Sequence, residues 1–372
     1  MSSRSFTDEQ LREIIALFQV YGDIKAVNRY GSGHINDTFK VDLSMGGVPV
    51  SYVLQRINDG IFTRPDRVME NIARVTNHIR GKFAGAADAT RRTLTVIPAR
   101  DGQPVARGPE GGWWRMYMFI AGARTIDLIE NADQARKAAR AFAGFQNALA
   151  DLPAPRLFET IPNFHNTLSR LEQLDTAAAE DKMGRKASVA DELAFVDAHR
   201  EEAGKIVKMM AAGEIPERIT HNDTKINNVM LDDVTGEGVA VIDLDTTMPG
   251  CALYDFGDMV RTSTAAAAED EKDLSKVFSR KEYFEALVKG YLSEAKFLTD
   301  AEKENLAFSG RLITFTIGIR FLADYLAGDT YFRTAYPEHN LVRCRTQFKM
   351  VKSMEDQAAD YEAIVRAVRE GR

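Results

Sequence analysis

The chain has 372 residues, 45% of them hydrophobic and 27% charged, which is ordinary for a globular protein and enough for two domains with a shared cleft. The formal net charge is −6, and lysine and arginine are dispersed among acidic residues, which argues against a generic nucleic-acid-binding protein. The first ten residues lack the apolar core of a signal peptide, and no run approaches the roughly 20 apolar residues that span a bilayer.

The N-terminal third is expected to form a small sheet with helices beside it. Thr7 followed by Gln10 is a capping-box pattern and predicts a helix over 7–20. Short apolar runs separated by glycine-rich turns then predict strands, and apolar residues at helical spacing predict one inserted helix. The predicted strands are 26–29, 38–43, 50–56, 94–98 and 113–120, and the predicted inserted helix is 66–79.

The rest of the chain is expected to be mainly helical. Two short strands are predicted around residues 219–243, and all other predicted elements are helices. We place a boundary near residue 120, which divides the chain into an N-terminal lobe of residues 1–120 and a C-terminal lobe of residues 121–372. The predicted helices are 132–149, 191–210, 281–295, 301–327 and 343–369.

The cysteines and histidines indicate neither disulfides nor a zinc site. Cys251 and Cys344 are far apart in the sequence, and the six histidines show no zinc-type spacing. We expect packed, reduced thiols, which fits a cytoplasmic protein without membrane contact. No long apolar stripe is left unexplained, so we expect a monomer.

Three polar residues stand at a spacing that predicts phosphoryl transfer. Asn228 follows Asp223 by five residues, and Asp243 follows Asn228 by fifteen. Transfer from a nucleotide needs one carboxylate to take the proton of the attacking hydroxyl, and an amide oxygen and a second carboxylate to hold Mg²⁺. Asp223 is therefore the candidate catalytic base, and Asn228 and Asp243, helped by Asp245, are candidate metal ligands. An Asx-rich turn explains each residue alone, but the joint spacing favours catalysis.

A glycine-rich turn near residue 31 is a candidate phosphate-binding loop. Gly31 and Gly33 let backbone amides approach phosphate oxygens closely, and Ser32 adds a hydroxyl. Hairpin geometry explains the two glycines equally well, and only the later acids favour the phosphate role. No Gly-Lys-Ser/Thr follows, so this is not a Walker A loop.

The string from His221 to Asn228 resembles the catalytic loop of protein kinases, with Asn222 where kinases have arginine. It resembles more closely the aminoglycoside phosphotransferase and choline kinase superfamily, whose loop is His-x-Asp-x-x-x-x-Asn and whose second acid lies in an Ile-Asp motif. The resemblance implies an α+β, bilobal protein-kinase-like fold, with a small antiparallel-sheet N-lobe and a larger, mainly helical C-lobe. It also implies that His221 braces the loop and that adenine binds at the hinge, near Met118 and Ile120.

Two further positions depart from the protein-kinase pattern. Many kinases have a lysine in the third strand that contacts the nucleotide phosphates, whereas Gln55 stands at that register here. Either Gln55 performs a reduced version of that task, or a cation from elsewhere supplies the charge. Asp255 begins an Asp-Phe-Gly string, but it lies twelve residues after Asp243. We interpret Asp255 as a structural acid that positions the catalytic loop.

Longer strings along nearly the whole chain resemble one branch of the superfamily, the N-acetylhexosamine 1-kinases of bacterial amino-sugar salvage. This resemblance implies ATP with Mg²⁺ and phosphorylation of the anomeric hydroxyl of N-acetylglucosamine or N-acetylgalactosamine. The strings are residues 30–36, 220–225, 242–246, 248–250, 255–258, 269–276, 320–326 and 336–343, together with Gln55.

Five residues are candidate sugar contacts. Arg320 and Asp324 lie four residues apart on one predicted helix and would face the same side, and Tyr331 follows where the chain leaves that helix. A salt bridge with a packed aromatic explains this set equally well on spacing alone. His34 and Asn36 could face the sugar or the phosphates, or simply complete a turn.

Other functions remain open from the sequence. A kinase acting on choline would need an aromatic cage, one acting on an aminoglycoside would need an acidic pocket, and homoserine or methylthioribose are further possible acceptors. A catalytically silent nucleotide-binding module is a further alternative, because the third-strand lysine is absent. The joint presence of Asp223, Asn228 and Asp243 argues against it.

Overall fold

The protein is described from a computed structural model, which covers residues 5–31 and 35–371. Two compact units are present. The first contains residues 1–124, 151–161 and 230–248, and the second contains residues 125–150, 162–229 and 249–372. The segments 151–161 and 230–248 therefore return to the first unit. A single boundary near residue 120 does not describe this division.

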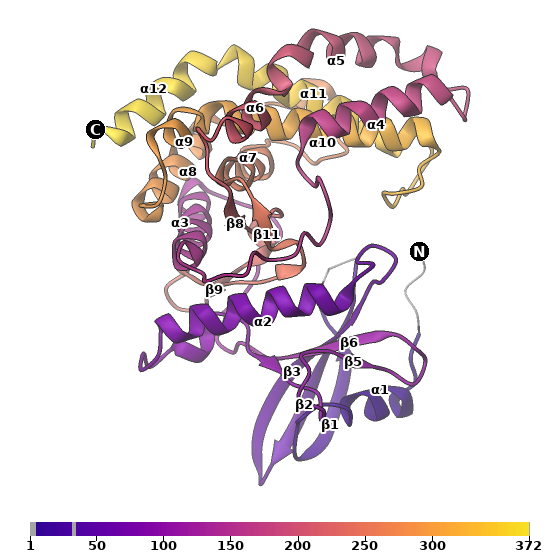
Figure 1. The fold of residues 1–372 in the computed structure, drawn as a ribbon, viewed down its shortest axis with the longest axis vertical. Helices are drawn as coiled ribbons and strands as arrows, with labels where there is room; N and C mark the ends of the chain where they lie inside the picture. The colour runs from indigo at the N-terminus through magenta and orange to yellow at the C-terminus, as the bar shows by residue number, and fades with distance from the viewer. Residues whose placement is uncertain (1–4, 32–34, 372) are drawn as a thin grey trace. The chain divides into compact units, whose positions relative to one another are not determined.

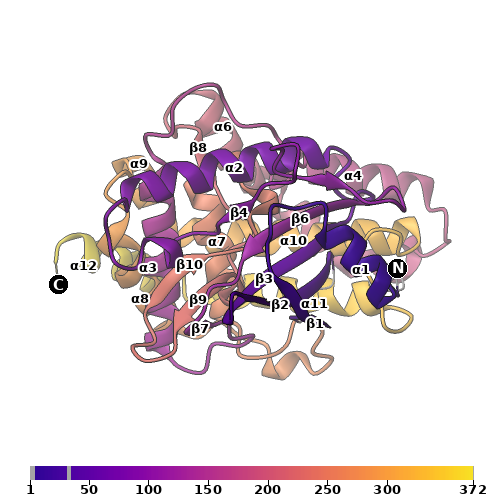
Figure 2. The same ribbon diagram turned by 90° about the horizontal axis from the view of Figure 1, so that it is seen from below.

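The first unit is built on an antiparallel sheet (Figure 1), which is seen from below in Figure 2. Its strands lie in the order β1-β2-β3-β6-β4, and β5 also pairs with β6. The strands are β1 (Asp23–Arg29), β2 (Asp37–Met45), β3 (Val48–Ile57), β4 (Val96–Ile97), β5 (Ala106–Arg107) and β6 (Trp113–Met118). The predicted strands of this region are confirmed.

Helix α1 (Asp8–Ile15) covers one side of this sheet. Its predicted cap is confirmed, because Thr7 Oγ1 accepts from the Gln10 amide at 3.2 Å and Gln10 Oε1 accepts from the Thr7 amide at 2.9 Å. The helix is shorter than the predicted 7–20, although the chain beyond it stays packed. Ile14 and Phe18 share a buried apolar cluster with Phe39 on β2, and burying each such side chain stabilises the fold by roughly 1.5–3 kcal/mol.

Helix α2 (Pro65–Lys82) ties the three segments of the first unit together. The buried Asn71 side chain donates to the carbonyl oxygens of Phe158 at 2.8 Å and Thr247 at 3.1 Å, and it accepts from the Phe158 amide at 3.0 Å. One residue of α2 therefore satisfies backbone groups from both returning segments. A second, three-stranded sheet has the order β10 (Gly238–Val241), β9 (Val229–Asp232), β7 (Ala123–Arg124).

The second unit is mainly helical. Its longest helix, α10 (Leu306–Ala327), packs against α4, α7 and α11 (Figure 1). A short sheet pairs β8 (Arg218–Thr220) with β11 (Met248–Gly250), where the chain re-enters this unit. The other helices are α3 (Ala132–Leu149), α4 (Thr167–Glu180), α5 (Ala190–Ala203), α6 (Lys205–Ala211), α7 (Ala252–Ser263), α8 (Lys281–Glu294), α9 (Asp300–Glu304), α11 (His339–Asp356) and α12 (Ala358–Arg369).

Within the described residues, α10 is the one helix whose length and apolar composition would allow it to cross a membrane. Its most apolar window is 72% buried inside the protein, as expected for a core helix. The predicted helix 301–327 is divided at Asn305 into α9 and α10, and the predicted helix 191–210 is divided at Gly204 into α5 and α6. Helices α4 and α7 were not predicted.

Candidate active site

The predicted catalytic loop follows β8 in the second unit, and its backbone is held by Asp255 at the start of α7. The amides of His221 and Asn222 donate to the two carboxylate oxygens of Asp255, at 2.8 and 2.7 Å. Asn222 has the left-handed conformation, with φ of 65°, which an Asn adopts more readily than most residues. The interpretation of Asp255 as the structural acid of this loop is confirmed.

Asp255 lies in a buried polar network. Gln146 on α3 donates to it at 2.6 Å and accepts in turn from the Tyr291 hydroxyl. Burial raises the pKa of Asp255 to about 6, although nearby His221 and the two loop amides favour the ionised form. The carboxylate is thus fixed by donors from the loop and from α3, and Tyr291 in turn fixes Gln146.

His221 braces the loop from inside. Its Nδ1 accepts from the Asp223 amide at 3.3 Å, and its ring makes edge contacts with Phe142 and Phe145 of α3, with centroids 5.4 and 5.9 Å apart. The side chain is fully buried. These contacts agree with a bracing position for His221, and its expected share in catalysis stays a prediction.

Asp223 is approached by two side chains from its own loop. Asn228 Nδ2 donates to the Asp223 carbonyl oxygen at 2.8 Å and to its Oδ2 at 3.1 Å. Lys225 Nζ lies 2.9 Å from Oδ1. Burial acts to raise the pKa of Asp223, but Lys225 opposes this effect and holds the pKa below its ordinary value. Asp223 is therefore a carboxylate at neutral pH.

Lys225 was not identified from the sequence, although its place two residues after the predicted base was visible. The same carboxylate raises the pKa of Lys225 above its ordinary value. Asp258 on α7 fixes the residue between them, since it accepts from the Thr224 amide at 3.0 Å and pairs with Arg261 at 2.8 Å. The loop thus presents one anionic and one cationic side chain from a rigid backbone.

His165 is a second residue that sequence reasoning missed. Its Nε2 lies 2.9 Å from the Asn222 carbonyl oxygen, directly before Asp223 in the chain. Burial lowers the pKa of His165 to about 4, so the ring is neutral near pH 7 and donates from Nε2. No sequence pattern marks His165, because it precedes the loop by more than fifty residues.

Asp243 and Asp245 belong to the first unit. Asp243 has a left-handed backbone, with φ of 57° and ψ of 59°, and directly precedes the 3₁₀ turn Leu244–Thr246. Asp245 is buried, and both of its carboxylate oxygens accept from Arg115 on β6. Its Oδ2 also accepts from Asn36 Nδ2 at 2.8 Å. Metal binding by Asp243 and Asp245 stays a prediction, and Asp245 already has three protein donors.

The remaining predicted nucleotide contacts lie in the first unit. Gln55 on β3 donates to Thr38 Oγ1 at 2.9 Å and accepts from Arg115 Nε at 2.9 Å. Met118 ends β6, and its amide donates to the Thr95 carbonyl oxygen, while Ile120 is buried just beyond. Gly31 is exposed, with φ of 80°. Ser32, Gly33 and His34 lie outside the described residues.

Arg320 on α10 lies within a group of aromatic rings. Its guanidinium carbon is 4.9 Å from the Phe164 ring centroid, 5.6 Å from that of Tyr331 and 5.4 Å from that of Phe332. Within the described part of the chain Arg320 makes a single hydrogen bond, to the Tyr331 hydroxyl, which is long at 3.4 Å. Burial lowers the pKa of Arg320. The structure thus brings Arg320 and Tyr331 together.

Asp324 faces a different set of partners. It accepts from the amides of Thr330 and Tyr331 at 2.8 Å, from that of Phe332 at 2.9 Å, and from Asn340 Nδ2 at 2.8 Å. The carboxylate therefore orders the segment that follows α10. The expected sugar contact of Asp324 would come in addition to these four hydrogen bonds. Asn36 donates to Asp245 and accepts from the Asn58 amide. Its expected contact with the sugar or the phosphates would likewise come in addition to these two hydrogen bonds.

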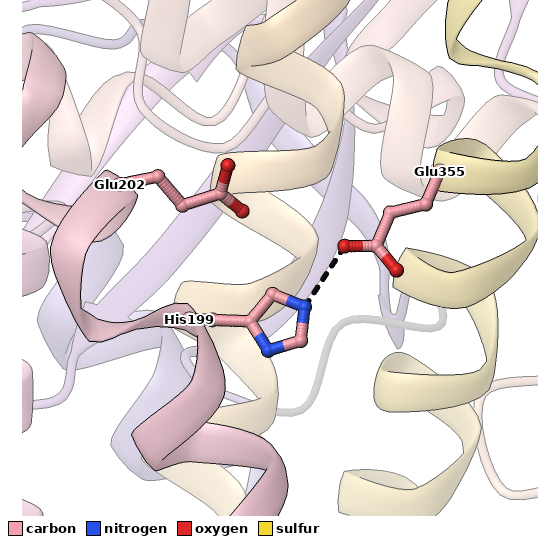
Figure 3. Close-up of side chains that lie close together, drawn as sticks. All are labelled: His199, Glu202 and Glu355. Atoms are coloured by element: carbon pink, nitrogen blue, oxygen red, sulfur yellow. Dashed lines mark hydrogen bonds and ion pairs between the residues drawn. The ribbon is translucent and has the colours of Figure 1, made fainter.

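A second group of ligand-type side chains lies between α5 and α11, where His199, Glu202 and Glu355 converge (Figure 3). His199 Nε2 is 2.9 Å from Glu355, and its Nδ1 is 2.6 Å from the Phe195 carbonyl oxygen. Arg311 lies 2.7 Å from Glu202 and 4.0 Å from Glu355. Because a guanidinium already balances both carboxylates, we interpret this group as an ion-pair network within the helices.

Comparison with known proteins decides the family. The sequence model of the phosphotransferase enzyme family matches residues 26–286, which is well over half of the chain. The chain belongs to this phosphotransferase enzyme family. The phosphotransferase domain therefore includes the sheet of the first unit, the catalytic loop, and the segment with Asp243.

Solved structures resemble this phosphotransferase over nearly its whole length. An aminoglycoside phosphotransferase from Alicyclobacillus acidocaldarius has a TM-score of 0.55 at 12% identity, covering 100% of this chain and 98% of that one. Spectinomycin phosphotransferase in complex with ADP and spectinomycin has a TM-score of 0.55 at 13% identity, and the match covers 96% of this chain and 99% of that one. Plasmodium vivax ethanolamine kinase has a TM-score of 0.54 at 13% identity, and the match covers 87% of this chain and 82% of that one. The predicted kinase-like α+β fold is confirmed.

Proposed function

We propose that this phosphotransferase uses Mg²⁺ and ATP to phosphorylate the anomeric hydroxyl of an N-acetylhexosamine, N-acetylglucosamine or N-acetylgalactosamine, as part of amino-sugar salvage. Family membership supports the transfer of a phosphoryl group. The nucleotide is supported by the Asp223, Asn228, Asp243 spacing and by the ADP bound in the similar spectinomycin phosphotransferase. The sugar is supported by the sequence strings described above and by the surroundings of Arg320.

In this proposal Asp223 accepts a hydrogen bond from the acceptor hydroxyl and orients it toward the terminal phosphate. The transition state of phosphoryl transfer is loose, so positioning and charge matter more than strong basicity. A carboxylate with a lowered pKa suits that task, because it is ionised whenever the acceptor binds. Lys225, 2.9 Å from Asp223, supplies a positive charge beside the transferred group.

Asn228 and Asp243 would hold Mg²⁺, which neutralises phosphate charge when it is bound. The side chain of Asn228 fits this task, because its Nδ2 is committed to Asp223 and its amide oxygen remains as an acceptor. A neutral amide oxygen and a carboxylate are the hard oxygen donors that Mg²⁺ prefers. The pairing of these two residues rests on their spacing in the sequence.

The observation that carries the choice of a neutral polyol is the half-buried guanidinium of Arg320. Three aromatic rings surround it. A cage that binds a quaternary ammonium group needs free space among its rings, and here Arg320 fills that space. A cationic acceptor such as choline, ethanolamine or an aminoglycoside would meet a like charge there. An acetamide carbonyl or a sugar hydroxyl would instead accept from Arg320.

The catalytic loop lies close to this cationic group within the second unit. Phe164, which packs on Arg320, directly precedes His165, and His165 bonds the carbonyl oxygen of Asn222. An acceptor that contacts Arg320 would therefore lie near Asp223. This relationship supports a substrate of monosaccharide size in preference to an extended one.

The experiment that tests the proposal is phosphate transfer from Mg·ATP to a panel of acceptors, with ³¹P NMR of the product. The panel contains N-acetylglucosamine, N-acetylgalactosamine, glucose, galactose, choline, homoserine and methylthioribose. We expect an anomeric sugar phosphate from the two N-acetylhexosamines. Transfer only to a non-sugar alcohol would reject the sugar and retain the roles of Asp223 and Asn228. Nucleotide binding without transfer to any acceptor would favour a catalytically silent module.

A further inference from the structure

The missing third-strand lysine has a structural counterpart in the neighbouring strand. Gln55 on β3 and Arg115 on β6 are direct partners in the antiparallel register, so their side chains project from the same face of the sheet. Arg115 Nε donates to Gln55 Oε1 at 2.9 Å. The sheet thus places a guanidinium beside the position where a lysine would otherwise stand.

Arg115 is deeply buried and makes a two-pronged ion pair. Its side chain is 1% exposed, and Nη1 and Nη2 donate to Oδ1 and Oδ2 of Asp245, the latter at 3.1 Å. Such fork-to-fork pairing fixes the angle of the carboxylate as well as its distance. Gln55 fixes the other edge of the guanidinium, because it is itself anchored to Thr38 on β2.

The ion pair anchors the turn that carries Asp243. Asp245 lies two residues after Asp243, inside the 3₁₀ turn. Arg115 and Asn36 hold this turn through Asp245, and Asn71 holds the carbonyl oxygen of Thr247 at its end. Asp243 has a left-handed backbone, which costs free energy in a non-glycine residue and persists only where the surroundings impose it.

We propose that Arg115 is a positioning residue for Asp243, acting through Asp245. Asp245 then serves as the counter-ion of Arg115 and is not itself a metal ligand. This inference rests on the proposed function, in which Asp243 holds Mg²⁺. The effect of Arg115 should consequently appear in the part of nucleotide affinity that depends on Mg²⁺.

The electrostatics of the pair agree with this assignment. Burial acts to lower the pKa of Arg115, but the charges of Asp245 and, more weakly, Asp243 raise it above its ordinary value. Asp243 therefore interacts electrostatically with the guanidinium. A buried cation beside both acids also limits their mutual repulsion when a nucleotide brings further negative charge.

The test compares ADP affinity in saturating MgCl₂ with ADP affinity in EDTA, by isothermal titration calorimetry on the full chain. The central variant is R115M/D245N, which removes both charges together and so leaves neither buried alone. We expect a cooperative melting transition, nearly unchanged affinity in EDTA, and a loss of about 10–100-fold in the affinity that Mg²⁺ adds, as for other residues that orient metal ligands. R115K, which keeps the charge without the fork, should be intermediate.

A matched control is R64M, because Arg64 makes the same two-pronged contact to Asp66, at 2.9 and 2.6 Å, but about half-exposed. R64M should leave both affinities unchanged. If Asp245 were itself a ligand, R115M would release it and tighten Mg²⁺-dependent binding, which would overturn the inference. An equal loss in EDTA and in Mg²⁺ would also overturn it. A wild type without any Mg²⁺ effect would instead reject the proposed function.

Discussion

Asn228 donates its side-chain amide to both the carbonyl oxygen and the carboxylate of Asp223, at 2.8 and 3.1 Å. The expected metal ligand and the expected base are thus linked before any substrate binds. Because one amide group satisfies both acceptors, the orientation of the Asp223 carboxylate depends on Asn228. The separate roles of Asn228 and Asp223 can therefore be measured only with variants that keep the loop intact.

Replacing Asp223 by Asn should abolish transfer while leaving nucleotide binding nearly unchanged. Asn keeps the shape and accepts from Asn228 through its oxygen, but it lacks the charge that orients the acceptor hydroxyl. We expect kcat to fall by about 10²–10⁴-fold. Steady-state kinetics with N-acetylglucosamine and ADP titrations measure the two effects. D175N, at a half-exposed acid paired with Arg200, is the control, and full turnover by D223N would remove Asp223 from its role.

Replacing Lys225 by Met should move the acid limb of the kcat/KM profile to higher pH. Lys225 lowers the pKa of Asp223 against the opposing effect of burial. Without the cation, burial acts alone, the pKa of Asp223 rises, and protonation begins at a higher pH. The pH dependence of kcat/KM measures this shift, with the exposed Lys182 as the K182M control. An unmoved limb would mean that another group sets it.

His165 should make stability depend on pH below neutrality. Its pKa is about 6.5 in the unfolded chain and about 4 in the folded protein, so only the unfolded state gains the proton between these values. Its contribution is complete above pH 6.5 and is lost as pH falls toward 4, on the order of 3 kcal/mol. Urea denaturation of wild type and H165Q across this range measures it, since Gln can still donate to the Asn222 carbonyl oxygen.

Asp255 contributes with the opposite sign over part of the same range. Its folded pKa of about 6 exceeds the ordinary value of 3.8, so its contribution is complete below pH 4 and is lost as pH rises to 6. The difference between wild type and H165Q cancels this second effect. We expect the two stability curves to converge as pH falls, and parallel curves would contradict the low pKa of His165.

Replacing Arg320 by Met should raise KM for the sugar and leave KM for ATP unchanged. Met fills much of the volume among the three rings but removes the donor. Loss of a hydrogen bond from a charged group corresponds to a change of about 10–100-fold in KM. R333M, at an exposed arginine of the segment after α10, is the control. If R320M instead gained activity toward choline, the rings would form the cage that Arg320 now fills.

Most elements of the fold could be predicted, because apolar spacing and turn residues mark them. The Thr7 cap and strands β1 to β3 followed from local pattern alone. Helix α7 was not predicted, because its Asp-Phe-Gly string was interpreted only as a kinase-like motif.

The catalytic loop could be predicted because its residues are neighbours in the sequence. Asp223, Asn228 and the supporting role of Asp255 all lie within forty residues. The partners that come from afar could not be predicted: His165 beside Asn222, and Arg115 beside Asp245. Spacing carries no information about such pairs, and Arg115 lies in a strand whose pattern indicates only a buried run.

The ion pair of Arg115 with Asp245 also constrains how the chain acquires its structure during synthesis. The two residues are 130 positions apart in the sequence, and Asn71 and Thr247 are 176 positions apart. At ribosomal speeds this interval is on the order of 10 s. Throughout that time the N-terminal sheet carries a guanidinium without its counter-ion, so this unit cannot mature before the helices α3 to α6 have emerged. A fragment that ends near residue 124 would keep this defect permanently, and would be a poor choice for studying nucleotide binding in isolation.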